Sequence, residues 1–349
     1  MSSPRIPAFF NEVQLAFKPL YEWAFGEKID HPETTARAES ILTALQAESA
    51  LFDVRPPKEI PLAALRSQHS HAMLTLYNTA RTLPEGETFY PMVFPNLKRG
   101  AGDPTNLHQA GAWCFDSGTP LNSQTLTAAE WSAACARDAA SALRHEKLPL
   151  TYSLSRPPGH HATRDLFGGY CYFNNAAVAA RYLRRFGRVA VVDIDFHHGN
   201  GTQSIFERDP KVLTVSLHGD PREHFPFFAG YAHETGAGPG EGYNLNVPLP
   251  TGIDGKVYLD ALDRHALASV RHYAPEYLVV SAGLDGYHKD PVGHWALTTE
   301  DFHAIGERLG RLGLPTVVVQ EGGYHAEDLG TNLVAVLRGL RAGQSAAGR

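Results

Sequence analysis

Four side chains that could bind a metal or carry protons lie within VAVVDIDFHHGNG, residues 189–201: Asp193, Asp195, His197 and His198. They follow an apolar, β-branched run that predicts a buried strand. Buried charges are costly unless they are paired or bind a metal. Because alternate side chains of an extended strand share a face, Asp193, Asp195 and His197 should converge where the strand ends. We therefore expect a functional site here rather than a set of caps and surface charges.

Further candidate side chains follow other predicted strands. LTYSLSRPPGHH ends in His160 and His161, YLVVSAGLDGYHKDP carries Asp285, and TVVVQEGGY ends in Tyr324. Taken singly, each is more typical of a cap or of packing. Ligands of open α/β sheets bind beyond the carboxyl ends of the strands, so together these groups form one candidate site. Within it, His160 is expected to be held by a carboxylate, and Asp193 is the nearest one.

The chemistry that these residue types favour is hydrolysis assisted by a metal. Three oxygen and nitrogen ligands with one open position are typical of catalytic zinc, and Asp195, His197 and Asp285 supply such a set. A metal there would polarise a carbonyl and acidify a water. His161 is the expected general base, and Tyr324 is the expected donor to the oxyanion of a tetrahedral intermediate. The prediction is an amidohydrolase.

The elements that must position these groups alternate between strand and helix from about residue 150 onward, which predicts an α/β fold with a central, mostly parallel sheet flanked by helices on both faces. The expected strands are 150–154, 189–194, 212–217, 277–282 and 316–320. The expected helices are 175–186, 202–208, 257–273, 300–312 and 327–340, with others starting at Pro32 and at a capping box, Thr127–Glu130. No linker divides the chain, so residues 1–349 are expected to form a single domain.

Composition excludes several classes of function. The net charge is −6 and no run of Lys or Arg stands out, so a nucleic-acid surface is not expected. No apolar stretch is long enough for a membrane span. The start, MSSPRIPAFF, lacks the apolar core of a signal peptide, and the three cysteines form no paired framework. These features predict a cytoplasmic protein.

The chain resembles the histone deacetylase superfamily, and most of all its bacterial acetylpolyamine amidohydrolase branch. The segments that carry the resemblance are RPPGHHATRDLFGGYCYFNNAAVAA, VDIDFHHGNGTQ, VSLHGDPREHFPFFAGYAHETG, GLDGYHKDP and QEGGY. It implies the arginase/deacetylase fold and a zinc-dependent deacetylase. It also implies the same roles as above: zinc on Asp195, His197 and Asp285, proton transfer by His160 and His161, and a transition-state donor in Tyr324.

The resemblance further implies structural monovalent cations, K⁺ or Na⁺, and a substrate tunnel. The first cation would be bound by Asp193, Ser216 and Leu217 with backbone oxygens of Asp195 and His197. The second would use backbone oxygens near Phe206, Asp209, Val212 and Tyr243. The tunnel would be lined by Tyr170 and Phe225, with the Gly169 carbonyl on the substrate amide and Glu22 at the mouth. A homodimer is implied by the long segment 84–123, which could also contribute to the mouth.

Several alternatives stay open at this stage. Arginase-like enzymes need a second metal ligand two residues after Asp285, where this chain has Tyr287, so one catalytic metal is favoured. The substrate is expected to be a small cationic acetylated amine, with an acetyl-lysine protein or peptide as the alternative. A catalytically silent binder of acylated amines is the second alternative. Asp103 and Asp116 are further candidates for binding the ammonium groups of such a substrate.

Some residues have less specific signals. His69 is expected on a helix surface or loop, and His218 is expected to support the site rather than bind metal. Arg37 would ordinarily be a surface helix charge, whereas the family resemblance implies that it could line an internal channel, and both alternatives stay open. Cys171 could be a nucleophile, but the neighbouring histidines already have a task in metal-assisted hydrolysis, so we do not expect that role.

Overall fold

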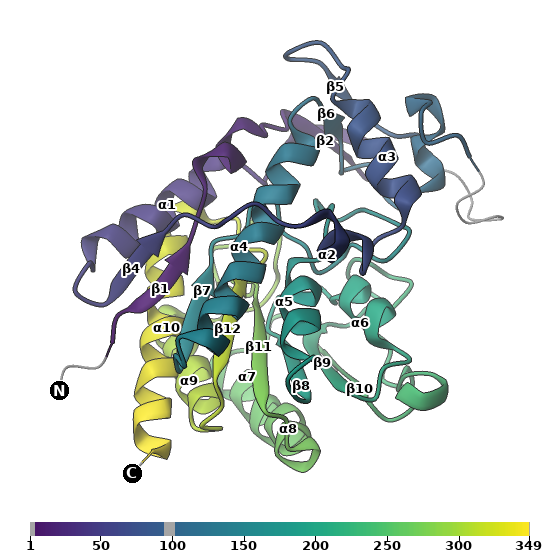
Figure 1. Ribbon diagram of the computed structural model, residues 1–349. Coiled ribbons are helices and arrows are strands. Elements are labelled where there is room, and N and C mark those ends of the chain that lie inside the picture. The colour runs from purple at the N-terminus through teal and green to yellow at the C-terminus, as the bar shows by residue number, and fades with distance from the viewer. Residues whose placement is uncertain (1–3, 94–101, 349) are drawn as a thin grey trace.

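The structure is a computed structural model, which describes residues 4–93 and 102–348. Its centre is an eight-stranded sheet with the order β10-β9-β8-β11-β12-β7-β1-β4 (Figure 1). Every strand pair in this sheet is parallel, which confirms the predicted architecture. The strands are β1 (Ile6–Phe9), β4 (Phe52–Arg55), β7 (Leu150–Ser153), β8 (Val189–Asp193), β9 (Val212–Gly219), β10 (Asn244–Leu249), β11 (Tyr277–Ala282) and β12 (Thr316–Gln320).

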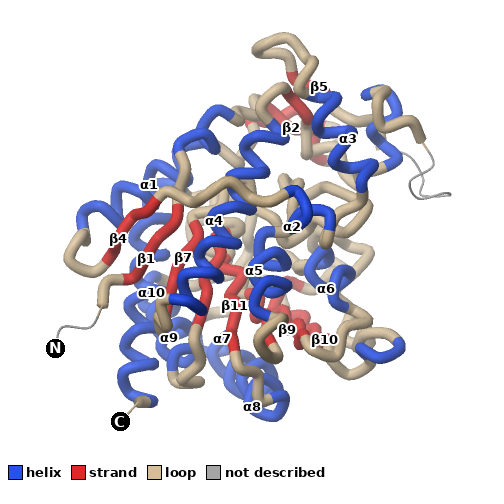
Figure 2. Tube along the Cα trace, in the orientation of Figure 1, coloured by secondary structure: helices blue, strands red, loops and turns tan. Residues whose placement is uncertain are grey.

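Helices cover both faces of the sheet, and the strands lie between the two groups (Figure 2). One face is covered by α4 (Thr125–His145) and α5 (Asn175–Leu183), with α6 (Asn200–Phe206) beside them. The other is covered by α1 (Thr35–Ala47), α7 (Gly255–Ala261), α8 (Ala268–Tyr273), α9 (Thr299–Gly310) and α10 (Ala326–Ala347). The described residues also contain the α-helices α2 (Leu62–Arg66) and α3 (His71–Ala80).

Strand β8 shows why this sequence forms a doubly covered sheet. All five residues of VAVVD are buried. Val189 and Val191 pack in the cluster with α4 and α5, whereas Ala190 and Val192 pack in the cluster with α9 and α10. Because both faces must be apolar, the strand is a continuous β-branched run rather than an alternating one.

The expected strands are confirmed to within two residues at each end, but β1, β4 and β10 were not predicted. Strand β10 is NLNVPL, with polar residues and a proline, and it lies at one edge of the sheet. The β1 strand contains a proline and β4 contains two charges, so neither has a continuous apolar run. Two short antiparallel ribbons, β2 (Tyr21–Ala24) with β3 (Glu27–Asp30) and β5 (Thr88–Phe89) with β6 (Leu121–Asn122), were also not predicted.

Two expected helix starts are wrong. Helix α1 begins at Thr35, because Thr34 is extended and so Pro32 lies before the helix. Helix α4 begins at Thr125, so Thr127 is inside it and forms no capping box. Residues 257–273 form a helix interrupted by a π-helical stretch, Leu262–Leu267.

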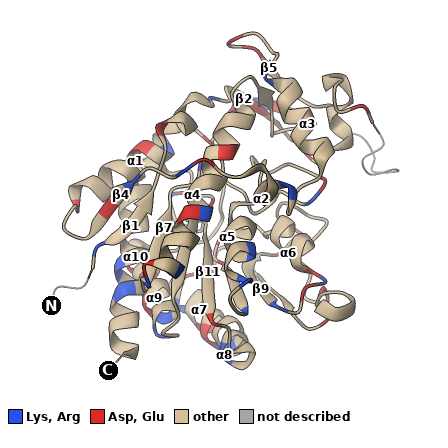
Figure 3. Ribbon diagram, viewed as in Figure 1, with Lys and Arg blue, Asp and Glu red and all other residues tan. Residues whose placement is uncertain are grey.

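The 84–123 segment is not a single loop, since it contains β5, the 3₁₀ helix η2 (Leu107–Ala112) and β6; residues 94–101 lie outside the described part. No helix in the described residues is long and apolar enough to cross a membrane. In the view of Figure 3, Lys and Arg are interspersed with Asp and Glu rather than gathered into one patch. The expectations of no nucleic-acid partner and of a cytoplasmic location stay predictions.

Candidate metal centre and active site

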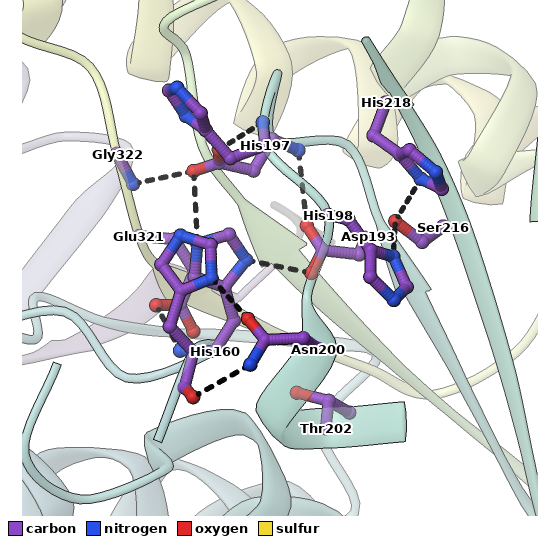
Figure 4. A network of polar contacts seen from close by, with 12 residues as sticks. His160, Asp193, His197, His198, Asn200, Thr202, Ser216, His218, Glu321 and Gly322 are labelled. Atoms are coloured by element: carbon purple, nitrogen blue, oxygen red, sulfur yellow. Dashed lines mark hydrogen bonds and ion pairs between the residues drawn. The ribbon is translucent and has the colours of Figure 1, made fainter. Parts of the chain in front are cut away.

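The candidate site lies beyond the carboxyl ends of four adjacent strands. His160 and His161 follow β7, the Asp193–His198 stretch follows β8, Asp285 follows β11, and Tyr324 follows β12. The sheet order β8-β11-β12-β7 places these strands side by side, although their sequence positions span about half of the chain. The parallel topology therefore brings the predicted residues to one edge of the sheet, as Figure 4 shows for His160, Asp193 and His197.

Asp195, His197 and Asp285 form a group in which one ligand atom from each lies within 4.8 Å of the others. The Nδ1 atom of His197 is 2.8 Å from Asp285 Oδ2 and 3.3 Å from Asp195 Oδ1. The remaining carboxylate oxygens are held by the backbone. Asp195 Oδ2 accepts the Gly322 N–H at 2.9 Å, and Asp285 Oδ1 accepts the Phe196 N–H at 2.8 Å. The three side chains are thus oriented toward one shared point.

The electrostatics of this group suit a divalent cation. Asp195 and Asp285 are buried next to one another, and burial together with the Asp195 charge raises the pKa of Asp285 to about 7. Burial also opposes ionisation of Asp195, but His160 and His197 outweigh it and lower the pKa of that carboxyl. A cation would compensate both carboxylates. Two oxygens and one imidazole nitrogen with an open position fit catalytic zinc.

A glycine is required where the chain crosses this group. A Cβ added to Gly283 would lie 1.8 Å from Asp195 Oδ2, so no side chain fits between β11 and the ligand. The same segment continues to Asp285 two residues later. The Gly-Leu-Asp sequence directly after β11 therefore lets Asp285 lie close to Asp195.

His160 is bound to a carboxylate, as predicted. Its Nδ1 lies 2.9 Å from Asp193 Oδ2, and the imidazole is buried (Figure 4). Burial disfavours its charge, but Asp195 and Asp193 outweigh this effect and raise the pKa of His160 to about 10. The structure therefore favours a charged His160.

His161 has a different environment, although the two rings are only 4.0 Å apart. Its Nδ1 lies 2.7 Å from the amide oxygen of Asn200, so the Nδ1–H donates a hydrogen bond to that oxygen and Nε2 is left as the acceptor. Burial, with charge on His160 and His197, lowers the pKa of His161 well below its usual range. A neutral imidazole with a free Nε2 is the form that a general base needs. Asn200 was not predicted as a site residue, although it follows the histidines directly in His-His-Gly-Asn-Gly and begins α6.

Tyr324 lies on the loop after β12. Its ring packs edge-on against Tyr170, with centroids 5.8 Å apart, and the Arg37 guanidinium lies 4.8 Å from its centroid. Burial raises the pKa of Tyr324 well above its usual range, so the phenol stays protonated and can donate a hydrogen bond. Arg37 is buried, donates to the carbonyls of Glu321 and Gly323, and pairs with Glu33. It supports the tyrosine loop, and the surface alternative for Arg37 is wrong.

The predicted entrance residues also lie together. The Phe225 ring packs edge-on against His161 at 5.0 Å, and the Tyr170 hydroxyl donates to Glu22 at 3.0 Å. Gly169 has φ +57°, and a Cβ there would lie 2.2 Å from the His161 ring, so only glycine fits. Burial raises the pKa of Glu22 to about 7, with Asp116 adding to the effect.

The two other acidic candidates have different surroundings. The Asp116 carboxylate accepts the backbone N–H groups of Gly169 and Gly118 and the Thr119 hydroxyl, so it orients the Gly169 turn. Asp103 is exposed, and its carboxylate accepts hydrogen bonds from the N–H and the hydroxyl of Thr105. No contact among the described residues joins Asp103 to the entrance.

The side chains expected to bind the first monovalent cation are neighbours. Asp193 pairs with Ser216 in the register of β8 and β9, and Leu217 follows in the buried strand. The Ser216 hydroxyl lies 2.8 Å from Nδ1 of His218, whose Nε2 lies 2.8 Å from the Gly230 carbonyl oxygen. His218 therefore supports this region, as expected.

The residues expected to bind the second cation also lie near one another. Phe206, Asp209 and Val212 span the turn that leads into β9, and Tyr243 lies beside the first residues of that strand. The Phe206 carbonyl accepts the Asp209 N–H at 2.8 Å, and the Asp209 carbonyl accepts the Val212 N–H at 3.1 Å. The Tyr243 carbonyl accepts the Thr214 N–H at 3.0 Å. Both monovalent sites stay predictions.

Two buried residues near the site were misjudged or missed. His69 lies in the turn between α2 and α3, which agrees with the loop alternative, but it is buried rather than on a surface: its Nδ1 contacts the Thr163 carbonyl and its Nε2 accepts the Asn174 N–H. Glu321 is buried, and its Oε2 accepts the N–H groups of Gly159 at 2.6 Å and His160 at 3.0 Å. It fixes the backbone of the histidine pair. The position of Glu321 within TVVVQEGGY gave no indication of these contacts.

Comparison with known proteins agrees with the geometry. The family model of the histone deacetylase domain matches residues 31–340. The chain belongs to the histone deacetylase family. Within this family it is 40% identical over 315 residues to acetylpolyamine amidohydrolase 2 of Pseudomonas aeruginosa, covering 88% of this chain and 91% of that protein. It is 41% identical over 344 residues to the acetylpolyamine amidohydrolase of Burkholderia pseudomallei, covering 96% and 98%.

Solved structures of the histone deacetylase family have the same fold. The crystal structure of acetylpolyamine aminohydrolase from Burkholderia pseudomallei superposes with a TM-score of 0.90 at 38% identity, covering 97% of this chain and 99% of that one. The HD domain of HDA15 superposes with a TM-score of 0.81 at 28% identity, covering 98% and 90%. The predicted family and fold are thereby confirmed.

Proposed function

We propose that this protein is a zinc-dependent amidohydrolase that removes acetyl groups from small acylated amines, above all acetylpolyamines. The observation that carries the proposal is the convergence of Asp195, His197 and Asp285 on one point beside a pair of histidines with opposite pKa shifts. The names of two relatives, acetylpolyamine amidohydrolases of Pseudomonas aeruginosa and Burkholderia pseudomallei, support the same reaction and substrate class.

The residues around the metal group have separate tasks in this reaction. Zinc bound by the three ligands would supply a Lewis acid that polarises the amide carbonyl and lowers the pKa of water. His161 Nε2 takes the proton of the attacking water and can return it to the leaving amine. The Tyr324 hydroxyl donates to the oxyanion. His160, charged through Asp193, stabilises negative charge that develops beside it.

The entrance suits an extended amine. The Phe225 ring packs against His161 and the Tyr170 ring packs against Tyr324, so each offers an apolar face beside a proposed catalytic group. Such faces favour a methylene chain over a bulky polar group. Glu22 provides a carboxylate at Tyr170 that can attract a distal ammonium group. The net charge of −6 also favours cationic substrates over anionic ones.

The test compares kcat/KM for acetylputrescine, acetylcadaverine, acetylspermidine and an acetyl-lysine peptide at low and moderate salt, with elemental analysis of the purified protein. A polyamine enzyme should contain zinc, should prefer the free acetylated amines, and should lose part of that preference as salt screens the entrance. If the peptide is preferred by about tenfold or more at both salts, the protein is a lysine deacetylase instead.

The alternative of a catalytically silent binder predicts bound metal and substrate without turnover of any of these compounds. All residues that the reaction requires are present, which favours the enzyme. The homodimer and the structural K⁺ or Na⁺ ions are further proposals from the family resemblance. Light scattering and potassium-dependent thermal stability test them separately.

A further inference from the structure

A second group of potential metal ligands lies beside the catalytic one. One ligand atom each from His160, Cys171 and Glu321 lies within 4.8 Å of the others, and all three residues are buried. We propose that this group binds a second divalent ion, Zn²⁺ in preference to Mg²⁺ or Ca²⁺, when metal is in excess, and that the second ion inhibits the enzyme.

Glu321 has an oxygen available for this ion. Its Oε2 is held by the N–H groups of Gly159 and His160, which fixes the carboxylate in place. Its Oε1 is buried and has no hydrogen-bond partner among the described residues. Buried polar atoms almost always have a partner, because an unpaired one costs about 1–3 kcal/mol. A cation near Oε1 would supply the missing partner.

His160 is oriented to contribute a ring nitrogen. Its Nδ1 is occupied by Asp193, which leaves Nε2 for other partners. A carboxylate on one imidazole nitrogen and a metal on the other is a recurring arrangement, because the carboxylate orients the ring and makes the ligand more basic. The Nε2 atom lies 3.8 Å from Asp195 Oδ2, so this second site adjoins the catalytic one.

Cys171 makes the proposed site selective. Its Sγ is buried and lies 3.2 Å from the Gly169 carbonyl, to which the thiol donates. Burial raises the pKa of this thiol, so it carries its proton until a metal displaces it. A thiolate is a soft ligand that favours Zn²⁺ over Mg²⁺ and Ca²⁺. Sulfur, nitrogen and oxygen ligands with a fourth position left for water are a ligand set that zinc accepts.

Inhibition follows because the two sites share surroundings. An ion on His160 Nε2 would occupy the ring nitrogen that lies 3.8 Å from Asp195 Oδ2 and would place a second cation beside the catalytic group. The inhibitory effect rests on the proposed function, whereas binding of the ion rests only on the three ligands. The two can therefore be measured separately.

The experiment begins with enzyme that contains one equivalent of metal per chain and adds Co²⁺ or Zn²⁺ in steps. Ion content is measured by elemental analysis, Co²⁺ coordination by absorption, and hydrolysis of one acetylated amine in parallel. The catalytic ligands contain no sulfur, so the first Co²⁺ should give no thiolate-to-metal charge-transfer band. The second Co²⁺ should give that near-ultraviolet band, and activity should fall over the same range of metal concentration.

Two variants and one control identify the ligands. Cys171→Ala should abolish the band and raise the inhibitory metal concentration by roughly tenfold or more. Even the loss of a residue that only supports a metal ligand lowers metal affinity by about that factor. Glu321→Gln, which keeps an oxygen acceptor for the backbone, should weaken the second ion similarly and serves if Cys171→Ala does not fold. Cys135→Ala removes an equally buried thiol of α4 and should leave both the band and the inhibition unchanged.

Binding of a second equivalent without a thiolate band, or equal inhibition of wild type and Cys171→Ala, would overturn the proposed site. Failure to bind a second equivalent at all would do the same. If the band appears with the second ion but the protein hydrolyses no acetylated amine, the metal site stands and the proposed function fails.

Discussion

The carboxylate of Asp290 accepts the backbone N–H of Tyr324 at 2.5 Å. The same Oδ2 accepts the His325 N–H, while Oδ1 accepts the N–H groups of Val292 and Gly293. Asp290 thus joins the loop that follows Asp285 to the loop that carries the phenol. One buried side chain therefore fixes the backbone of the expected oxyanion donor relative to the loop that continues from Asp285.

Asp290→Asn should lower kcat by up to about 10²-fold with little change in KM, since small displacements of a reacting group have costs of that order. If Asp290 acts through Tyr324, the same substitution should cost much less in a Tyr324→Phe background, and the metal content should not change. Equal losses in both backgrounds would show that Asp290 only stabilises the fold.

Tyr324→Phe should reduce kcat by about 10²–10³-fold, because it keeps the ring but removes a donor of the kind found in oxyanion holes. The zinc content and the KM should remain close to those of the wild type, since the hydroxyl is no metal ligand in the proposal. Steady-state kinetics with elemental analysis measures both. Unchanged turnover would exclude the role assigned to this phenol.

Asp285→Ala should remove the catalytic metal and the activity together. The substitution leaves only Asp195 and His197 of the three proposed ligands. It also removes the acceptor of the Phe196 N–H, which is Asp285 Oδ1 in the wild type. Elemental analysis after dialysis should show less than one ion per chain. Two ions per chain at full wild-type activity would instead support an arginase-like centre, and would differ from the inhibitory second ion proposed above.

Asn200→Asp should shift the acid limb of the kcat/KM profile to higher pH. The new carboxylate would replace an amide oxygen that lies 2.7 Å from His161 Nδ1, so the positive form of the imidazole would be stabilised and the pKa of His161 would rise. The imidazole can act as a general base only in its neutral form. In the variant, a higher pH is needed to bring His161 into that form. Asn200→Ala, which adds no charge, is the control; a profile unchanged in Asn200→Asp would argue against His161 as the base.

Preference for cationic substrates should fall as the pH drops through about 7. Burial raises the pKa of Glu22 to about 7, so this carboxyl is charged above that pH and neutral below it. The amino groups of acetylpolyamines remain charged throughout this range. The ratio of kcat/KM for acetylputrescine to that for an uncharged acetylated alkylamine should therefore decrease toward acid pH, since the ratio cancels effects on the chemistry.

Glu22→Gln should give a low ratio that does not vary with pH, because the amide resembles the neutral carboxyl. Asp103→Asn is the matched control, since Asp103 is exposed and has no described contact with the entrance. A ratio that still varies with pH in Glu22→Gln would assign the effect to another group.

Much of the framework was predictable from the sequence. Five strands were identified as β-branched runs because a parallel sheet buried on both faces requires apolar residues at successive positions, as in β8. Asp195, His197, His161, Asp285 and Tyr324 were identified because polar groups directly after such strands must lie at one edge of the sheet. Strands without that pattern, such as β10 with its polar residues and proline, were missed.

Only the tertiary structure decided which partner each functional group has. His160 and His161 are adjacent in sequence, yet one contacts Asp193 and the other Asn200, and this difference separates a charged imidazole from a neutral one. The buried positions of His69 and Glu321 were likewise not visible. Strand patterns depend on local burial and so appear in the sequence, whereas partners of a buried polar group come from distant loops whose contacts are set by packing.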